Sequence, residues 1–510
     1  MPRKVLFIQP FQFVKKSLSN EVLMWFIYLE NYLKAKLRKI IMDVIYLPAE
    51  NNIKSSLDIL PLTPDDFKVL HSVLDHAISN IDFNLDDRTY ICLSGSTTFD
   101  YPAVKMIAEY LQENFSKSIL LFGGYHASSC PNDFSYSYSP IDYVITGEGE
   151  IALYNLIKSE IKKQNHPTII EGSPIDNLNM LPPLDLTFLN KYINYFKDKA
   201  SGLSISLSRG CPHNCSYCVE KNLVKGKKIK RWRAYSPKRA VQETNTLINY
   251  GLNQGIKFYG FLDPCFGYNR KWLNNFLDLY QVDPQIIYHF IETRVDILNE
   301  KLLSKLQKKK MFQFYGVDSF SEKMLEIMNK THNPVEYLNQ FKRVLSIHKN
   351  LEYKCNLGIL INHPGETIKT VEKTYNYLKK IKENDYNEVF NYNLTFYHLF
   401  AKTMNYEKLD FFNKKYGTKA YFPEWWKDIK TLKLGVFAVR ASSELSLRES
   451  INHFVEKQLE IDRIKYEKDK KDGFGLFFAK MSTLKKQRND LIRFLDEHNI
   501  EVEEHNIFSV

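Results

Sequence analysis

The feature that most constrains this chain is a tight group of three cysteines. Cys211, Cys215 and Cys218 stand in the run that begins at Ser208, with the spacing C-x3-C-x2-C. Thiolates spaced this closely usually bind a metal. A closed zinc or iron–sulfur site takes four protein ligands, so three cysteines predict a cubane cluster with one open iron, which could chelate a small molecule through an amine and a carboxylate. The alternative is a zinc knuckle, for which His213 or a distant residue would supply the fourth ligand.

Length and cysteine content limit the remaining possibilities. The chain has 510 residues, which predicts two or three domains. Its 7 cysteines are an odd number in a long chain, so a disulfide scaffold is not expected. No signal peptide or apolar run of about 18 residues is found, so we expect no membrane span and a cytoplasmic protein, where thiols stay reduced.

The net charge of +11 comes largely from local lysine runs. Two examples are the segment from Lys225 to Lys230 and the triplet Lys308–Lys310. Such runs are typical of a solvated surface, but the first lies close to the cysteines and could instead bind an acidic peptide. No nucleic-acid-binding motif is found, so a nucleic-acid partner is not expected.

Residues 1–170 alternate between strand-like and helical segments. The expected strands are Val5–Gln9, Ile40–Tyr46, Tyr90–Ser94, Ile119–Phe122 and Tyr143–Ile145, and the expected helices include Asn20–Leu37 and Ala103–Glu113. This alternation predicts an α/β fold with a Rossmann-like, doubly wound parallel sheet. Ligands bind such sheets at the carboxyl ends of the strands, where glycines let a ligand approach the backbone. The glycines at these ends are Gly95, Gly123, Gly124 and Gly147.

A second βα series is predicted over residues 201–400, after a linker at 171–200. Its expected strands are Leu203–Leu207, Lys257–Leu262, Ile286–Ile291, Phe312–Tyr315, part of Leu351–Ile361, and Asn391–Phe396. This rhythm predicts a partial (β/α)6 barrel, whose chemistry lies at the carboxyl ends of its strands. Residues 401–510 are expected to form a helical C-terminal domain that caps the barrel or holds a substrate. Its expected helices are Trp426–Leu445, Leu447–Tyr466 and Leu484–His498.

The cysteine motif and the segments at the strand ends together resemble the radical S-adenosylmethionine (SAM) superfamily. The matching segments are Tyr217 before the last cysteine, Asp263–Phe266, Glu292–Arg294, Gly316–Ser319 and Pro364–Thr367. The resemblance covers about residues 200–400. It implies a [4Fe–4S] cluster on Cys211, Cys215 and Cys218, a bound SAM, and an electron donor such as flavodoxin or ferredoxin. It also implies that SAM is cleaved to a 5′-deoxyadenosyl radical that attacks a C–H bond.

The same resemblance suggests which residues contact SAM. Asp263 would receive the ammonium group, and Glu292 and Arg294 would hold the carboxylate or the ribose. Asp318, followed by Ser319, stands where the family pattern has glutamate, so its ribose contact is less certain. Each of these residues taken alone is more often a helix cap or an ion-pair partner.

The N-terminal region is similar to the cobalamin-binding domain that precedes many radical SAM barrels. The matching segments are Gly123–His126 and Ile141–Glu150. The D-x-H-x-x-G motif of classical cobalamin modules is absent, and many radical SAM relatives also lack it. Cobalamin is therefore an open alternative to an empty pocket. His126 is either a ligand or a turn histidine bonded to the backbone.

Two further cysteines lie on or near the predicted barrel strands. Cys265 follows the second strand and Cys355 lies in the fifth. A thiol beside a substrate radical donates hydrogen to it, and radical SAM peptide epimerases finish their reaction in this way. The alternative is that both cysteines are small buried apolar residues. Cys92 and Cys130 are expected to be structural.

Three functions remain from the sequence. The favoured one is epimerisation of residues in a ribosomally made peptide, which rests on the two barrel thiols as catalytic groups. The alternative is a cobalamin-dependent C-methyltransferase of peptide or natural-product biosynthesis. The third, a cluster protein without catalytic activity, fits poorly with the set of SAM-site segments.

Overall fold

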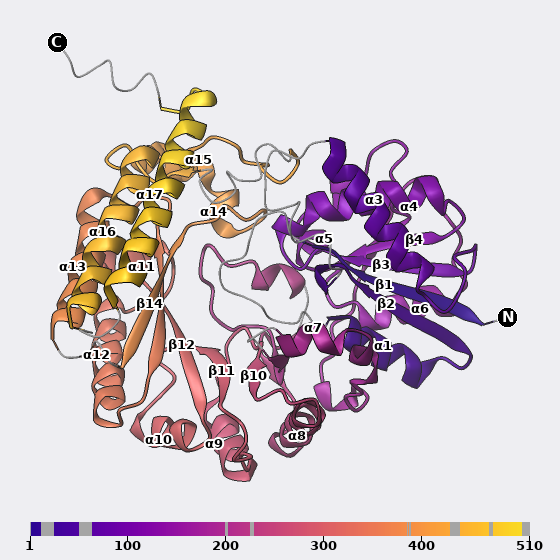
Figure 1. The fold of residues 1–510 in the computed structure, drawn as a ribbon, viewed down its shortest axis with the longest axis horizontal. Helices are drawn as coiled ribbons and strands as arrows, with labels where there is room; N and C mark the ends of the chain where they lie inside the picture. The colour runs from indigo at the N-terminus through magenta and orange to yellow at the C-terminus, as the bar shows by residue number, and fades with distance from the viewer. Residues whose placement is uncertain are drawn as a thin grey trace.

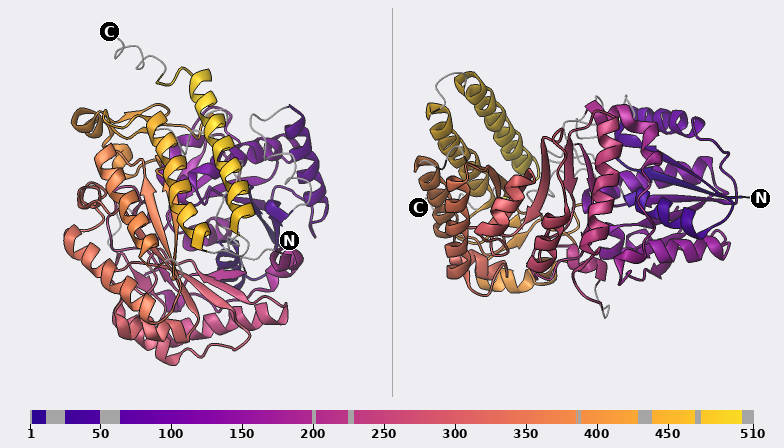
Figure 2. Two further views of the ribbon diagram at one scale, coloured as in Figure 1. Left: turned by 60° about the vertical axis from the view of Figure 1, so that its left-hand side comes forward. Right: turned by 90° about the horizontal axis from the view of Figure 1, so that it is seen from below.

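Two parallel sheets form the body of the protein. The computed structural model describes residues 2–11, 25–49, 64–198, 202–224, 229–384, 386, 389–428, 439–468 and 473–501. The first sheet, with its helices, fills the right half of Figure 1, and the second fills the left half. Figure 2 shows the two C-terminal helices on the far side of the second sheet from the N-terminus.

The first sheet has the strand order β2-β1-β3-β4-β5-β6, and every pairing in it is parallel. Its strands are β1 (Arg3–Gln9), β2 (Ile40–Tyr46), β3 (Thr89–Ser94), β4 (Ile119–Gly123), β5 (Tyr143–Thr146) and β6 (Thr168–Glu171). The chain order reverses between β1 and β3, where doubly wound sheets bind ligands. The sequence did not predict β6, which is short and mostly exposed.

Both faces of this sheet are covered. Val5 and Phe7 of β1 pack into one core, whereas Leu6 and Ile8 pack into another, because successive side chains of a strand point to opposite faces. The helices of this half are α1 (Trp25–Lys36), α3 (Pro64–Ser79), α4 (Tyr101–Asn114), α5 (Tyr125–Ser129) and α6 (Glu150–Lys158), with the short helices η1 (Leu47–Ala49), η2 (Thr98–Asp100) and η3 (Pro131–Phe134). The predicted Rossmann-like fold is confirmed. Residues 20–24 of the predicted first helix lie outside the described residues.

Short helices occupy the segment that joins the two sheets. They are η4 (Leu178–Met180), η5 (Thr187–Tyr192) and α7 (Ile193–Asp198). Residues 199–201 lie outside the described residues. The domain boundaries proposed from the sequence therefore stay a prediction.

The second sheet has the order β14-β13-β12-β11-β10-β7, again with parallel pairings throughout. Its strands are β7 (Leu203–Ile205), β10 (Phe258–Phe261), β11 (Tyr288–Thr293), β12 (Met311–Asp318), β13 (Cys355–Ile361) and β14 (Phe390–Phe396). Its helices are α8 (Pro237–Asn253), α9 (Arg270–Leu279), α10 (Glu300–Lys308), α11 (Glu322–Ile327), α12 (Pro334–Asn350) and α13 (Ile368–Glu383). Strands that follow one another in sequence are neighbours in space. This arrangement confirms the predicted partial barrel.

The barrel strands β12 and β13 each have a helix-facing side and an open side. Along β13, Cys355, Leu357 and Ile359 are fully buried, whereas Asn356 and Gly358 between them are only partly buried. The same alternation runs along β12. Because side chains alternate along a strand, the buried series packs against the helices and the other series faces the inside of the barrel.

The C-terminal region consists of helices and one small hairpin. Its elements are α14 (Met404–Glu407), α15 (Leu409–Tyr416), β15 (Lys419–Ala420), β16 (Val439–Arg440), α16 (Leu447–Lys468) and α17 (Gly473–Glu497). The helix predicted over Trp426–Leu445 is wrong, because Trp426–Asp428 form a turn and a bend, and β16 pairs antiparallel with β15 near the other end. Residues 429–438 of that helix lie outside the described residues. The other two predicted helices correspond to α16 and α17.

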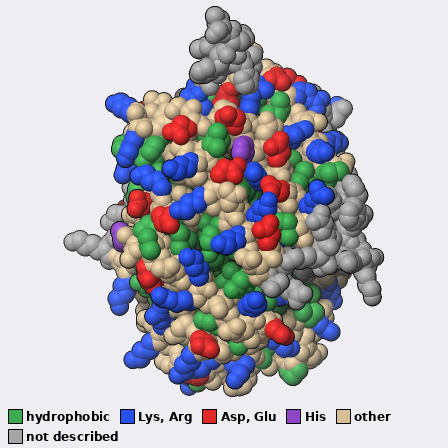
Figure 3. All heavy atoms as spheres, turned by 90° about the vertical axis from the view of Figure 1, so that its left-hand side faces the viewer, with side chains coloured by type: hydrophobic (Ala, Val, Ile, Leu, Met, Phe, Trp, Pro, Cys, Tyr) green, Lys and Arg blue, Asp and Glu red, His purple; other side chains and the backbone are tan. Residues whose placement is uncertain are grey.

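The charged side chains on the outer face of the barrel half are mixed in sign. Figure 3 shows blue and red side chains interspersed across this face. Such mixing fits a solvated surface. The lysine run that begins at Lys225 lies partly outside the described residues, at 225–228. In the described part of the chain, no helix is long and apolar enough to cross a membrane.

Two glycines with positive φ give a matched test of the barrel packing. Gly202, with φ +69°, precedes β7, and a Cβ added there would lie 1.8 Å from the Phe258 carbonyl oxygen of β10. Gly255, with φ +78°, has no atom within 4 Å of its added Cβ. Gly255→Ala should therefore cost only about 1–2 kcal/mol, the cost of left-handed backbone. Gly202→Ala should lower the denaturant midpoint clearly further, and equal losses for the two variants would contradict the packing described here.

Candidate functional site

The loop of the three cysteines is anchored at the carboxyl ends of the barrel strands. It runs from β8 (Ser208–Arg209) to η6 (Glu220–Val224), and β8 pairs with β9 (Arg233–Ala234). The Ser216 N–H donates to the Met328 carbonyl at 2.8 Å, and the Asn329 amide donates to the Asn214 carbonyl at 2.7 Å. Met328 and Asn329 follow α11, so the chain after β12 holds the loop in place.

The three cysteines are free and half-buried in this loop. Cys265, just after β10, is fully buried, and its thiol is hydrogen-bonded to Cys211. That hydrogen bond lowers the pKa of Cys211 to about 7 and raises the pKa of Cys265. The structure therefore brings Cys265 to the cysteine loop, as a fourth thiol beside Cys211.

A buried network of charged groups lies against the loop. The Tyr217 hydroxyl donates to Oδ2 of Asp318, and the Lys330 ammonium lies 2.7 Å from the same oxygen. Arg294 donates to Asp296 at 2.9 and 2.8 Å and to the Lys330 carbonyl at 3.1 Å. Burial lowers the pKa of Lys330, but Asp318 and, more weakly, Cys215 outweigh it and raise that pKa above its ordinary value. Two fixed cations thus lie beside the thiols.

Two buried nitrogen atoms next to the loop have no hydrogen-bond partner. They are Nη1 of Arg294 and Nε2 of His213. Burial lowers the pKa of His213 to about 4, so its ring is neutral. A buried donor without a partner costs free energy, and a carboxylate bound here would pair with Arg294. The loop and its surroundings therefore fit a ligand with an anionic group, as SAM has.

The sequence analysis also associated Asp263, Glu292 and Ser319 with SAM, and these three residues lie on or just after three different barrel strands. Asp263 is buried and accepts hydrogen bonds from the Ser208 hydroxyl and, at 3.2 Å, the Leu207 N–H. Burial raises the pKa of Asp263 to about 7. Glu292 lies on the open side of β11. Ser319 faces α13, where its hydroxyl bonds that of Thr374 at 3.0 Å.

Cys355 lies away from the cysteine loop. It is the first residue of β13, at the amino end of the strand, and its side chain belongs to the series that packs against the helices. The loop lies at the opposite, carboxyl end of the barrel strands. The hydrogen-donor role of Cys355 and Cys265 stays a prediction, and of the two only Cys265 lies beside the cysteines.

A cavity of about 460 Å³ lies between the first sheet and the cysteine loop. Its walls include Gly123, Gly124 and Gly147 from the strand ends of the first sheet. Its other side includes Gly210, the residue before Cys211, and Pro264, the residue before Cys265. The fourth strand-end glycine, Gly95, lies behind this wall, where its N–H donates to the Gly123 carbonyl at 2.9 Å. The cavity thus joins the ligand edge of the first sheet to the loop.

Ion pairs at the edge of the cavity tie the two halves together. Arg209 contacts Glu148 at 3.0 Å and Glu150 at 2.6 Å, and Arg233 also pairs with Glu148. The sequence analysis did not assign these residues or Lys330. Arg209 stands beside the cysteine motif and Glu148 within Gly-Glu-Gly-Glu, which could have suggested a role. No sequence pattern pointed to Lys330.

Comparison with known proteins agrees with this geometry. Residues 205–378 match the family described as Radical SAM superfamily. The chain contains a radical SAM domain. This domain implies a [4Fe–4S] cluster and SAM as cofactors. The expected recognition and cofactors are thereby confirmed, and the residues that bind them remain proposals.

The similar proteins include methyltransferases. An uncharacterised methyltransferase of Pyrococcus horikoshii is 27% identical over 58% of this chain and 64% of its own length. An anaerobic magnesium-protoporphyrin IX monomethyl ester cyclase of Cereibacter sphaeroides is 24% identical over 55% of this chain and 48% of its own length. The matches thus span less than two thirds of these curated relatives.

A solved structure shares the fold over most of the chain. The radical SAM methyltransferase TsrM of Kitasatospora setae, with tryptophan and a SAM analogue bound, superposes with a TM-score of 0.57 at 15% identity. The superposition covers 82% of this chain and 78% of TsrM. Another TsrM structure contains cobalamin and a [4Fe–4S] cluster. At this identity the likeness shows a common fold.

We propose Cys211, Cys215 and Cys218 as the cluster ligands. Replacing the three by alanine should remove about four irons per chain and abolish SAM cleavage, because no other described cysteines are grouped on one loop. Cys355→Ala is the matched control, since this thiol is buried at the other end of the barrel strand, and it should retain the iron. Iron analysis after anaerobic reconstitution gives the answer, and full iron content in the triple variant would refute the assignment.

Proposed function

We propose that this protein is a cobalamin-dependent radical SAM C-methyltransferase. The observation that carries the proposal is that one continuous cavity extends from the strand-end glycines of the first sheet to the cysteine loop. A methyl carrier held by the first sheet would thereby lie next to SAM. The methyltransferase relative and the fold shared with TsrM support the same reaction class.

The walls of the cavity suit a large ligand rich in amide groups, such as cobalamin. Gly123 and Gly147 leave the backbone open, and hydroxyl groups are contributed by Ser94, Ser96 and Thr97. The buried Ser204 hydroxyl also lines the cavity and has no hydrogen-bond partner. His126 is not part of the lining, so we propose that this chain binds cobalamin without that histidine as a ligand.

The chain's own residues would hold the reactants in place. Arg294 and His213 offer unpaired nitrogens for the carboxylate of SAM, and Glu292, on the open side of β11, would receive its ammonium group. Cobalamin and SAM, when bound, would supply the methyl group and the one-electron chemistry that replaces a substrate hydrogen by methyl. The ion pairs of Arg209 and Arg233 with Glu148 would keep the two halves together during turnover.

The substrate would lie on the open side of the barrel sheet. Phe290 and Phe314 pack there with their rings tilted by 49° and the ring centroids 6.1 Å apart, and Glu292 lies on the same side of β11. An aromatic pair next to a carboxylate suits a small organic molecule or a peptide side chain with an aromatic or cationic part. An external protein, such as flavodoxin or ferredoxin, would supply the electron.

Epimerisation, the function favoured by the sequence, is less well supported. It requires a thiol on the face of the substrate opposite to SAM. Cys355 points into the helix layer, and Cys265 is bonded to the cysteine loop. Neither position favours a donor that lies across the substrate from SAM.

Product analysis separates the two reactions. With cobalamin, SAM and a reductant, the proposed methyltransferase should form S-adenosylhomocysteine and add one methyl mass to its substrate. Omitting cobalamin should stop the reaction. Conversion in deuterated water without the methyl mass, with one solvent deuterium in the product and no need for cobalamin, would establish the epimerase instead.

A further inference from the structure

A second group of potential metal ligands lies in the first half of the chain, on α5, η3 and the residue between them, where α5 packs against η6. A histidine nitrogen, the Cys130 sulfur and an Asp133 carboxylate oxygen lie within 4.8 Å of one another. Cys130 and Asp133 are largely buried, and the His126 ring is completely buried.

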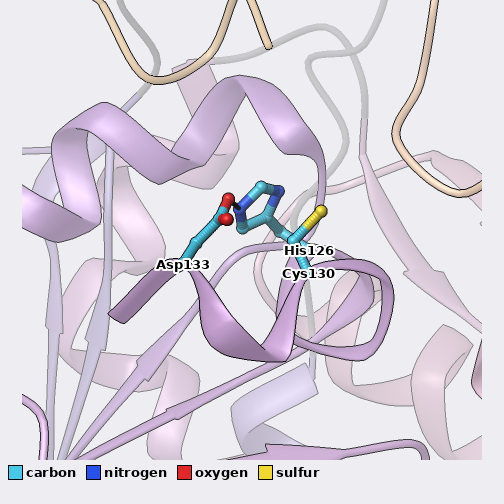
Figure 4. A group of neighbouring side chains, drawn as sticks. All are labelled: His126, Cys130 and Asp133. Atoms are coloured by element: carbon cyan, nitrogen blue, oxygen red, sulfur yellow. Dashed lines mark hydrogen bonds and ion pairs between the residues drawn. The ribbon is translucent and has the colours of Figure 1, made fainter. Parts of the chain in front are cut away.

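The two nitrogens of His126 have different environments. Nε2 lies 3.1 Å from the Asp133 carboxylate, whereas Nδ1 is buried without any hydrogen-bond partner. Figure 4 shows the Cys130 sulfur beside the ring, on the side away from the Asp133 carboxylate. The unpartnered nitrogen therefore faces a thiol. A buried polar atom left without a partner costs about 1–3 kcal/mol, and a bound ion would remove this cost.

The contact between Nε2 and Asp133 is the one that a metal-binding histidine usually makes through its second nitrogen. A metal-bound histidine donates its other N–H to a carboxylate, which fixes the tautomer and the ring orientation. Asp133 is placed to accept that hydrogen, and its carboxylate is held by the Trp426 indole N–H at 2.6 Å and lies 3.5 Å from the Lys427 ammonium. Burial lowers the pKa of His126, which keeps the ring neutral, as a ligand must be.

We propose that His126 Nδ1 and Cys130 Sγ bind an ion of the zinc class, with Asp133 orienting the histidine. Nitrogen and thiolate are ligands that zinc prefers. Two protein ligands leave positions for water, so we expect an exchangeable ion rather than a permanently enclosed one. On binding, the thiol of Cys130 releases its proton to solvent, and no electron is transferred.

The position of this site suggests what the ion does. α5 follows Gly124 directly, and Gly123 and Gly124 line the large cavity. Trp426, which holds Asp133, belongs to the C-terminal region. An ion at His126 and Cys130 would therefore fix the wall of the cavity and its contact with the C-terminal region.

The first test is a Co²⁺ titration of full-length protein that carries Cys211→Ser, Cys215→Ser and Cys218→Ser, so that the cysteine loop cannot compete. We expect one Co²⁺ per chain with a thiolate-to-cobalt charge-transfer band. Adding Cys130→Ala should abolish that band. Asp133→Asn should weaken binding about 10- to 100-fold, the usual effect of losing the carboxylate behind a ligating histidine. Cys92→Ala, which removes the buried thiol of β3 in the same half of the chain, should change nothing.

A second measurement avoids the triple serine background. The unaltered chain, with its cluster reconstituted, should unfold at a higher temperature when Zn²⁺ is added, because a ligand that binds only the folded state stabilises it. Cys130→Ala should lose this shift and keep its iron, while Cys92→Ala should retain both. A charge-transfer band or a Zn²⁺ shift that survives Cys130→Ala overturns the proposal. So does a folded protein that shows neither signal.

Discussion

The arrangement of the functional site depends on how the two halves of the protein are joined. Arg209, next to the cysteine loop, and Arg233 of β9 both pair with Glu148 at the end of the first sheet. All three side chains are largely removed from solvent. Removing one partner of such a pair leaves a buried charge uncompensated, which typically costs about 3–5 kcal/mol. The pairs therefore hold the carboxyl ends of the first sheet against the loop, and the cavity exists because these edges meet.

The sequence predicted the overall architecture because its periodic signals were strong. Buried parallel strands such as β1 and β4 read as short apolar runs between helices, and the strand ends were marked by glycine or by polar residues. The helix predicted over Trp426–Leu445 failed for a physical reason. Of its described residues, Trp426 is buried and donates its indole N–H to Asp133, and Val439 is buried where β16 pairs with β15. Apolar content alone does not separate these contacts from one face of a helix.

The site was predicted less completely than the fold. A motif of cysteines in one loop can be read from the sequence, and so can Tyr217 within that motif and Asp318 at the end of β12, which the structure brings together. Lys330 could not be found in this way, because its role depends on a contact with Asp318 across a turn and a helix. The orientation of Cys355 depends on which face of β13 meets the helices, and alternation along one strand does not tell the two faces apart. Cys130, between α5 and η3, was interpreted as structural because the sequence does not show that its sulfur lies beside the His126 ring.

The central claim is that cobalamin occupies the cavity between the two halves. Equilibrium binding of cobalamin to the reconstituted wild-type protein and to Gly123→Leu, followed by absorption spectroscopy, tests it most directly. A Cβ at Gly123 would have only the Ile145 carbonyl oxygen nearby, at 3.7 Å, so the larger side chain can extend into the cavity without a backbone clash. The account predicts that the wild-type protein binds one cobalamin and that Gly123→Leu loses this binding while it keeps its iron. Unchanged binding by Gly123→Leu, or no binding by the wild-type protein, would contradict it.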